Sequence, residues 1–229
     1  MNAPSSPLTL LFLPCSATKN SPLHAVFPAP GRALLTVLSR SAEALREGRQ
    51  ELADCVDWQS PEFAALDYYD GALYQVPGLR AAVGAAMRSG GVDVVILSGG
   101  YGAVYADEPI HRYEEKMDFA YWKIRGLPAV LEECIELSGA RTVYGFLART
   151  TAYARILRAV NWAELRRRNR LAEAGLFYLE FPGREGAQSK VPPAIGGAVV
   201  EFIAAGFDRP RLLAKDYEGY RFAYEELGA

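Results

Sequence analysis

Two short apolar runs constrain the fold of this chain more than any other feature. Leu8–Leu13 (LTLLFL) ends at Pro14, and Val92–Leu97 (VDVVIL) is followed at once by serine and glycine. Strands that do not alternate between apolar and polar residues are typical of a parallel sheet with both faces covered. The sequence therefore predicts that these two runs are central strands of such a sheet.

Further predicted elements alternate along the chain. Strands are expected at Thr142–Phe146 and Leu176–Phe181, with a possible short one at Leu52–Val56. Helices are expected at Arg32–Glu47, Leu79–Met87, Pro128–Ser138, Thr151–Arg170 and Ala194–Ala205. Strands that alternate with helices favour an α/β fold in three layers, with a mostly parallel sheet and helices on both of its faces.

The organisation of the sequence favours one domain over residues 1–229. Half of the residues are apolar, which is enough for a full core, and no repeat or linker divides the chain. The tail after about residue 207 is expected to be a helical appendage.

The N-terminal sequence and the cysteines bear on location. Met1–Pro7 lacks the positive charge of a secretory signal, and Leu8–Leu13 is too short to span a membrane. The three cysteines are widely spaced and only two histidines are present, so we expect neither a disulfide framework nor a metal site. A cytoplasmic protein with no membrane partner and no cofactor is the simplest expectation.

The loop after the first strand carries the strongest candidate for chemistry. Cys15 and Lys19 lie four residues apart, with Ser16 between them, and an ammonium group nearby favours the thiolate form of a cysteine. Lysine can also bind a phosphate or a carboxylate as a point charge. The alternative is a small buried cysteine beside a solvated lysine.

A second loop follows the strand at Val92–Leu97. Ligands of open parallel sheets bind beyond the carboxyl ends of the strands, so the two loops would share one pocket if their strands are neighbours. Glycine-rich backbone can approach a ligand closely, although a tight turn explains the glycines equally well. The candidate ligand-binding residues here are Ser98, Gly99, Gly100, Tyr101, Gly102, Arg112 and Tyr113, and the candidate acid–base residues are Glu108 and His111.

A third segment, residues 68–74, is rich in tyrosine. Tyr74 offers an aromatic face on which a base could stack, and Asp70 is a candidate site acid. Packing in the core is the alternative for any one of these tyrosines.

Arginines gather between residues 141 and 170. Eight of them stand against a single acid, Glu164, although the net charge of the chain is −2. A basic helix face could follow a phosphate backbone, whereas a solvated face is the usual explanation for a run of charges. The candidate nucleic-acid contacts are Arg149, Arg155, Arg166, Arg167, Arg168 and Lys190.

Taken together, these segments resemble the YaaA family of peroxide-stress proteins. The most specific block runs from Leu97 to Met117, where Leu-Ser-Gly-Gly-Tyr-Gly is followed by Pro-Ile-His-Arg-Tyr-Glu-Glu-Lys-Met. Tyr69–Gln75 and Ala148–Tyr153 are similar to two shorter segments of that family. The order of residues 111–114 departs from the family, which indicates a divergent relative. The resemblance implies DNA binding and a role in limiting oxidative DNA damage.

The first loop is also similar to a second group. Pro14, Cys15 and Lys19, followed by Ser21 and His24, resemble the Pro-Cys-x-x-x-Lys signature of archaeosine synthase, which modifies a deazaguanine base in tRNA. Asn20-Ser21 replaces the Pro-Tyr of that signature. This resemblance implies nucleobases as ligands.

Three functions are consistent with these features. The first is a YaaA-like DNA-binding protein of the oxidative-stress type, which holds phosphates through the arginine-rich helix. The second is an enzyme that acts on a nucleobase, nucleoside or modified base, with Cys15 or Lys19 as nucleophile or charge stabiliser. The third is a small-molecule binder or biosynthetic enzyme unrelated to nucleic acid.

Overall fold

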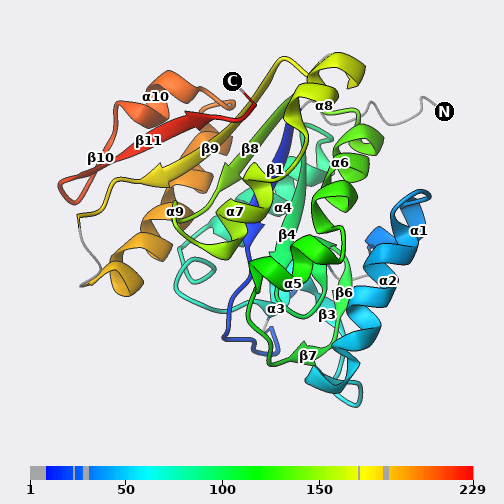
Figure 1. Cartoon of the computed structure of the whole chain (residues 1–229). Coiled ribbons are helices and arrows are strands. Elements are labelled where there is room, and N and C mark those ends of the chain that lie inside the picture. Colours follow the sequence, from blue (N-terminus) through cyan, green and yellow to red (C-terminus); the bar gives the residue numbers. More distant parts are fainter. Residues whose placement is uncertain (1–8, 23, 28–30, 170, 183–185, 229) are drawn as a thin grey trace.

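A seven-stranded sheet forms the centre of the computed structural model, which describes residues 9–22, 24–27, 31–169, 171–182 and 186–228 (Figure 1). Its strand order is β10-β11-β9-β8-β1-β4-β5. These strands are β1 (Thr9–Pro14), β4 (Val92–Ser98), β5 (Gly102–Tyr105), β8 (Thr142–Phe146), β9 (Glu173–Leu179), β10 (Asp216–Tyr217) and β11 (Tyr220–Glu226). The expected α/β fold with a mostly parallel sheet is confirmed.

β1 lies in the interior of the sheet, and its side chains are buried on both faces. Leu10 to Leu13 are fully buried, as the absence of alternation in their sequence predicts. β1 pairs in parallel with β4 on one side and with β8 on the other, and β8 pairs in parallel with β9. β5, β10 and β11 complete the sheet with antiparallel pairings.

One face of the sheet is covered by helices that lie between residues 34 and 169. They are α1 (Leu34–Val37), α2 (Ala42–Glu51), α5 (Phe119–Ile124), α6 (Leu127–Ser138), α7 (Ala152–Arg158) and α8 (Trp162–Asn169). Trp122, Leu131 and Leu157 pack from these helices against Leu10 and Phe12 of β1 in one buried cluster.

The other face is covered by α3 (Ala65–Tyr68), α4 (Leu79–Arg88), α9 (Ala187–Ala204) and α10 (Arg209–Leu213) (Figure 1). Aromatic rings fill this side of the core, with the centroids of Phe146 and Phe177 5.0 Å apart and Phe202 of α9 packed on both. Helices therefore lie on both faces of the sheet, in three layers.

The expected helix over residues 32–47 is divided into two, α1 and α2. The carboxylate of Glu133 on α6 accepts hydrogen bonds from the backbone N–H groups of Ser39, Arg40 and Ser41. These bonds hold the three residues in a non-helical turn. The helix expected at Thr151–Arg170 is also divided, between α7 and α8, where the Asn161 N–H donates to a carboxylate on α6.

Two short ribbons lie outside the main sheet. β2 (Val56–Asp57) pairs with β7 (Arg112–Tyr113), and β3 (Phe63–Ala64) pairs with β6 (Pro109–Ile110). The possible strand at Leu52–Val56 is instead a turn of 3₁₀ helix at Ala53–Cys55 that leads into β2.

The tail after Phe207 is not a helical appendage, because it adds an antiparallel strand to the sheet. After α10 the chain forms β10 and β11, and β11 pairs with β9. Tyr220, Phe222 and Tyr224 alternate along β11 and pack on the aromatic side of the core, as β-forming residues do at the edge of a sheet.

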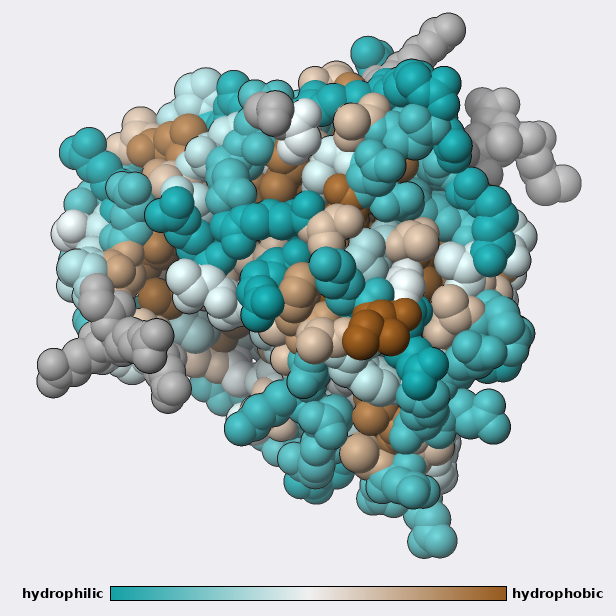
Figure 2. Space-filling model, viewed as in Figure 1, coloured by the Kyte–Doolittle hydropathy of each residue, from teal (hydrophilic) through white to brown (hydrophobic). Residues whose placement is uncertain are grey.

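Polar side chains dominate the face of the molecule that Figure 2 shows, and the apolar groups on it are scattered. Within the described ranges, no helix is both long and apolar enough to cross a bilayer.

Candidate active site

The connections of the parallel strands change direction between β1 and β8. The chain leaves β1 for its parallel neighbour β4 on one side, and it leaves β8 for β9 on the other. Two loops that diverge in this way leave a crevice at the carboxyl ends of the strands, which is where open α/β sheets bind ligands. The loops in question begin at Cys15 and at Leu147.

A cavity of about 470 Å³ lies at this position. Its lining comprises Pro14, Cys15, Ser16, Ala17, Gly71, Ala72, Leu73, Tyr74, Ala148, Thr150, Thr151, Tyr153, Ala187, Val191, Pro192 and Ile195. A mostly apolar lining with a few polar atoms is typical of small-molecule sites, and the volume falls within their usual range.

Cys15 presents its thiol where β1 ends. Its backbone N–H donates to Leu97 O at 2.9 Å, which continues the pairing of β1 with β4 by one residue. Its Sγ lies 3.1 Å from the hydroxyl of Tyr153, the second residue of α7. Burial raises the pKa of Tyr153, so this hydroxyl stays protonated and can donate to a thiolate.

Lys19 lies behind Cys15 rather than in the cavity. Only 6% of the residue is exposed, and its Nζ lies 4.0 Å from the centre of the Tyr113 ring and donates to Ala17 O at 3.2 Å. Burial lowers the pKa of Lys19, and the negative charge of a Cys15 thiolate acts to raise it again. The Lys19 ammonium therefore lies where a negative charge on Cys15 would stabilise it.

A cluster of buried hydroxyls surrounds the ammonium group. The hydroxyls of Tyr69 and Tyr113 lie 2.8 Å apart, and Ser98 donates to Tyr113 at 2.9 Å. Burial raises the pKa of both tyrosines, and the charge of a Cys15 thiolate raises it further. β1 and β4 are neighbours, as expected, and Ser98 bonds to Tyr113, whose ring contacts Lys19. The two loops do not share one pocket, however, because none of the residues 98–102 lines the cavity at Cys15.

The glycines of the second loop pack against the protein itself. A Cβ on Gly99 would lie 2.4 Å from Glu115 O, and one on Gly100 would lie 2.6 Å from Tyr113 Cδ2. Gly102 has a φ of +71° and lies against Trp122. Close packing by the chain at residues 113–122 thus explains these glycines, and the structure places neither them nor Tyr101 in the cavity lining.

Tyr74 and Ser16 do line the cavity, whereas Asp70 faces a different pocket. The Tyr74 hydroxyl donates to Pro14 O at 2.7 Å, which holds the ring at the cavity wall. The Asp70 carboxylate accepts from Asn20 at 2.6 Å and pairs with Arg80 at 3.0 Å. The hydrogen bond from Asn20, supported by Arg80, lowers the pKa of Asp70, which keeps it ionised in a polar pocket of about 410 Å³.

The remaining candidate acid–base residues lie outside the cavity. Glu108 is buried, accepts from the backbone N–H groups of Leu34 and Tyr105, and pairs with Arg49 at 3.1 Å. Burial raises its pKa against the opposing effect of that arginine. His111 bonds to Ser60 O at 2.8 Å. Arg112 is exposed beside Glu114.

The arginines of α8 pair with acids of the same helix and of neighbouring elements. Arg166 pairs with Glu226 of β11, Arg167 pairs with Glu164, and Arg168 pairs with Glu164 and Glu136. Three further basic candidates also have partners within the described chain. Arg149 and Arg155 lie over the rings of Tyr178 and Phe119, and Lys190 pairs with Glu218.

Sequence reasoning missed Tyr153 and the contribution of α9 to the site. The stretch Ala148–Tyr153 carries part of the resemblance to the YaaA family, and its tyrosine is the signal that points to this residue. Val191, Pro192 and Ile195 close the cavity from α9, and nothing in their apolar sequence distinguishes them from core residues.

No group of three histidine, cysteine or carboxylate side chains that could hold a metal ion occurs in the part of the chain that the structure describes. No protein-family model matches the chain, and no curated protein matches it at a significant level. The resemblances of sequence motifs to known families therefore stay predictions.

Proposed function

We propose that this protein is an enzyme that acts on a nucleobase, a nucleoside or a modified base, with Cys15 as nucleophile and Lys19 as the charge that stabilises its thiolate. One observation carries the proposal. The Cys15 thiol faces a small-molecule cavity at the crevice of the sheet, between the buried Lys19 ammonium and the Tyr153 hydroxyl.

The groups around Cys15 fit a nucleophile better than a structural cysteine. A structural cysteine is normally enclosed by apolar side chains, as Cys134 is in the core of this protein. Cys15 is instead half-exposed, and it has a cation and a hydroxyl donor beside it. Reactive cysteines occur in such electropositive and partly accessible surroundings.

The chemistry would be addition of sulfur to an electron-poor carbon of the ring. The Cys15 sulfur forms a bond to that carbon, and the electron pair of the adjacent C=N bond moves to nitrogen. The nitrogen takes up one proton, which balances the proton that the thiol has lost. The substituent on that carbon then leaves with a proton as the C=N bond forms again, and water adds to the same carbon. Expulsion of the sulfur regenerates the thiolate and leaves the base with oxygen in place of the substituent.

DNA binding through the arginine-rich stretch is the alternative that the sequence raises. Each arginine of the Arg166–Arg168 cluster already pairs with a carboxylate, so a phosphate would have to displace that partner. The structure therefore favours the cavity over this helix as the functional site.

The proposal is tested by incubating the protein with mixed bases and nucleosides and analysing products and protein by mass spectrometry. We expect an altered or released base, and a loss of that product in Cys15→Ser and Lys19→Met. Cys55→Ser is the matched control, since Cys55 is half-exposed and lies outside the cavity. A product that persists in Cys15→Ser would overturn the proposal.

A further inference from the structure

We infer that the ligand of the Cys15 cavity is an uncharged base or nucleoside, and that the cavity excludes nucleotides and nucleic-acid strands. This inference rests on the proposed function and specifies its substrate class. It follows from the charges around the cavity, the hydroxyls in its wall and the position of the nearest ammonium group.

The described lining of the cavity carries no charged side chain that could pair with a phosphate. Among the described residues, its lining has no lysine, arginine or histidine, and also no aspartate or glutamate. Transfer of a charged group into a mostly apolar site without a partner is strongly unfavourable. A phosphate that entered the cavity would lose water and gain no cation from the described lining residues.

The basic residues adjacent in sequence to the lining have other partners. The Arg149 guanidinium lies 5.0 Å from the centre of the Tyr178 ring, and Lys190 pairs with Glu218 in a separate pocket beside Tyr217. Lys19 is buried behind Cys15, where it can stabilise the sulfur. Its position suits a charge that develops on Cys15 rather than a charge on the ligand.

The wall of the cavity instead suits a flat, neutral ring. Leu73, Val191 and Ile195 offer apolar contacts beside the aromatic side chain of Tyr74. The Ser16 hydroxyl accepts from the Thr18 N–H at 3.1 Å and keeps its own proton to donate to a ring nitrogen or carbonyl. Hydroxyls of this kind recognise the polar edge of a heterocycle without requiring a charge.

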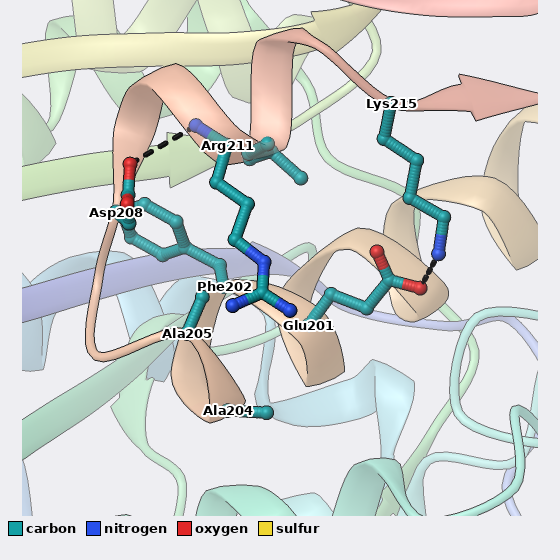
Figure 3. Close-up of a pocket in the computed structure, with 8 residues that line it drawn as sticks. Glu201, Phe202, Ala204, Ala205, Asp208, Arg211 and Lys215 are labelled. Carbon is teal, nitrogen blue, oxygen red and sulfur yellow. Dashed lines mark hydrogen bonds and ion pairs between the residues drawn. The ribbon is translucent and has the colours of Figure 1, made fainter.

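A second, charged pocket lies between α9 and α10, so a binding test must measure Cys15 itself. Figure 3 shows the pocket between α9 and α10, where the Arg211 side chain extends toward Glu201, which pairs with Lys215. A phosphate could bind weakly to such a surface. Total binding would then report on both places, whereas the reactivity of Cys15 reports on the cavity alone.

The experiment measures how strongly each compound protects Cys15 from iodoacetamide, with the alkylated residue identified by mass spectrometry. Each purine and pyrimidine is offered as the free base, the nucleoside and the 5′-monophosphate, together with a short oligonucleotide. We expect a base or its nucleoside to protect Cys15, and the monophosphate to need a concentration higher by a factor of about ten or more. Ser16→Ala should weaken protection, and Arg149→Ala should leave the preference unchanged.

Two results would overturn the inference, and they differ in what they say about the proposed function. Protection by the monophosphate or the oligonucleotide that equals or exceeds protection by the nucleoside would overturn the inference alone, because the cavity would still bind a base. An absence of protection by every compound would overturn both.

Discussion

Replacement of Tyr153 by phenylalanine removes one hydrogen-bond donor from the Cys15 sulfur and leaves the ring in place. The two atoms are 3.1 Å apart, and a hydrogen bond to a charged group contributes about 1.5 kcal/mol at the lower end of its range. A loss of that size corresponds to a factor of about ten in an equilibrium constant. We therefore expect Cys15 to react with iodoacetamide about three to four times more slowly, since a sulfur that has lost this donor is also about threefold more nucleophilic.

Tyr74→Phe is the matched control for this experiment. The Tyr74 hydroxyl lies at the same cavity but donates to Pro14 O, so its removal should change the rate less than about twofold. Cys55 provides an internal reference for the reagent, and thermal melting confirms that both variants fold. A rate in Tyr153→Phe equal to that of the unmodified protein, or an equal slowing in Tyr74→Phe, would show that the Tyr153 hydroxyl does not activate Cys15.

Three further outcomes follow from the packing and the charges. Gly99→Ala should lower the free energy of unfolding, measured by urea titration, by about 2 kcal/mol, because the added Cβ would lie 2.4 Å from Glu115 O. Gly91→Ala should have little effect in the same titration, because the nearest atom to its Cβ, Ser89 Oγ, is 3.6 Å away. Burial acts to raise the pKa of Glu133, but hydrogen bonds from the turn before α2 outweigh it and lower that pKa to about 2. The stability that this carboxylate adds is therefore complete above its ordinary pKa of 4.5, and about 3 kcal/mol of it is lost as the pH falls toward 2. If the free energy of unfolding of Glu133→Gln fell as steeply with pH as that of the unmodified protein, this would be contradicted. Replacement of Arg166–Arg168 by alanine should change the affinity for an oligonucleotide less than about threefold in an anisotropy titration, because these side chains are already paired with carboxylates. A loss of affinity of about tenfold or more would instead support DNA binding through these arginines.

The central strands could be predicted because their sequence depends on burial alone. Leu10–Leu13 and Val94–Leu97 are covered on both faces, so every position is apolar. β11 could not be found in this way, since Phe222 is its one buried side chain and its charged positions resemble a loop. The start of α9 was also missed, because Pro192 and Pro193 lie inside the helix and normally indicate that a helix has not yet begun.

The sequence predicted the part of the site that lies in one short segment. Cys15 and Lys19 lie in one short loop after a recognisable strand, so their proximity follows from the sequence. Tyr153 reaches Cys15 from a point 138 residues away, and only the pairing of β8 with β1 brings the two together. The glycines at 99 and 100 looked available to a ligand because the sequence does not show that residues 113–116 pack on them.

The decisive measurement is a crystal structure of Cys15→Ser soaked with the nucleosides that protect the natural protein. We expect the base to lie in the cavity between Tyr74 and the first turns of α9, with an electron-poor ring carbon against residue 15. A base bound at α8 or between α9 and α10, with the cavity empty, would contradict it.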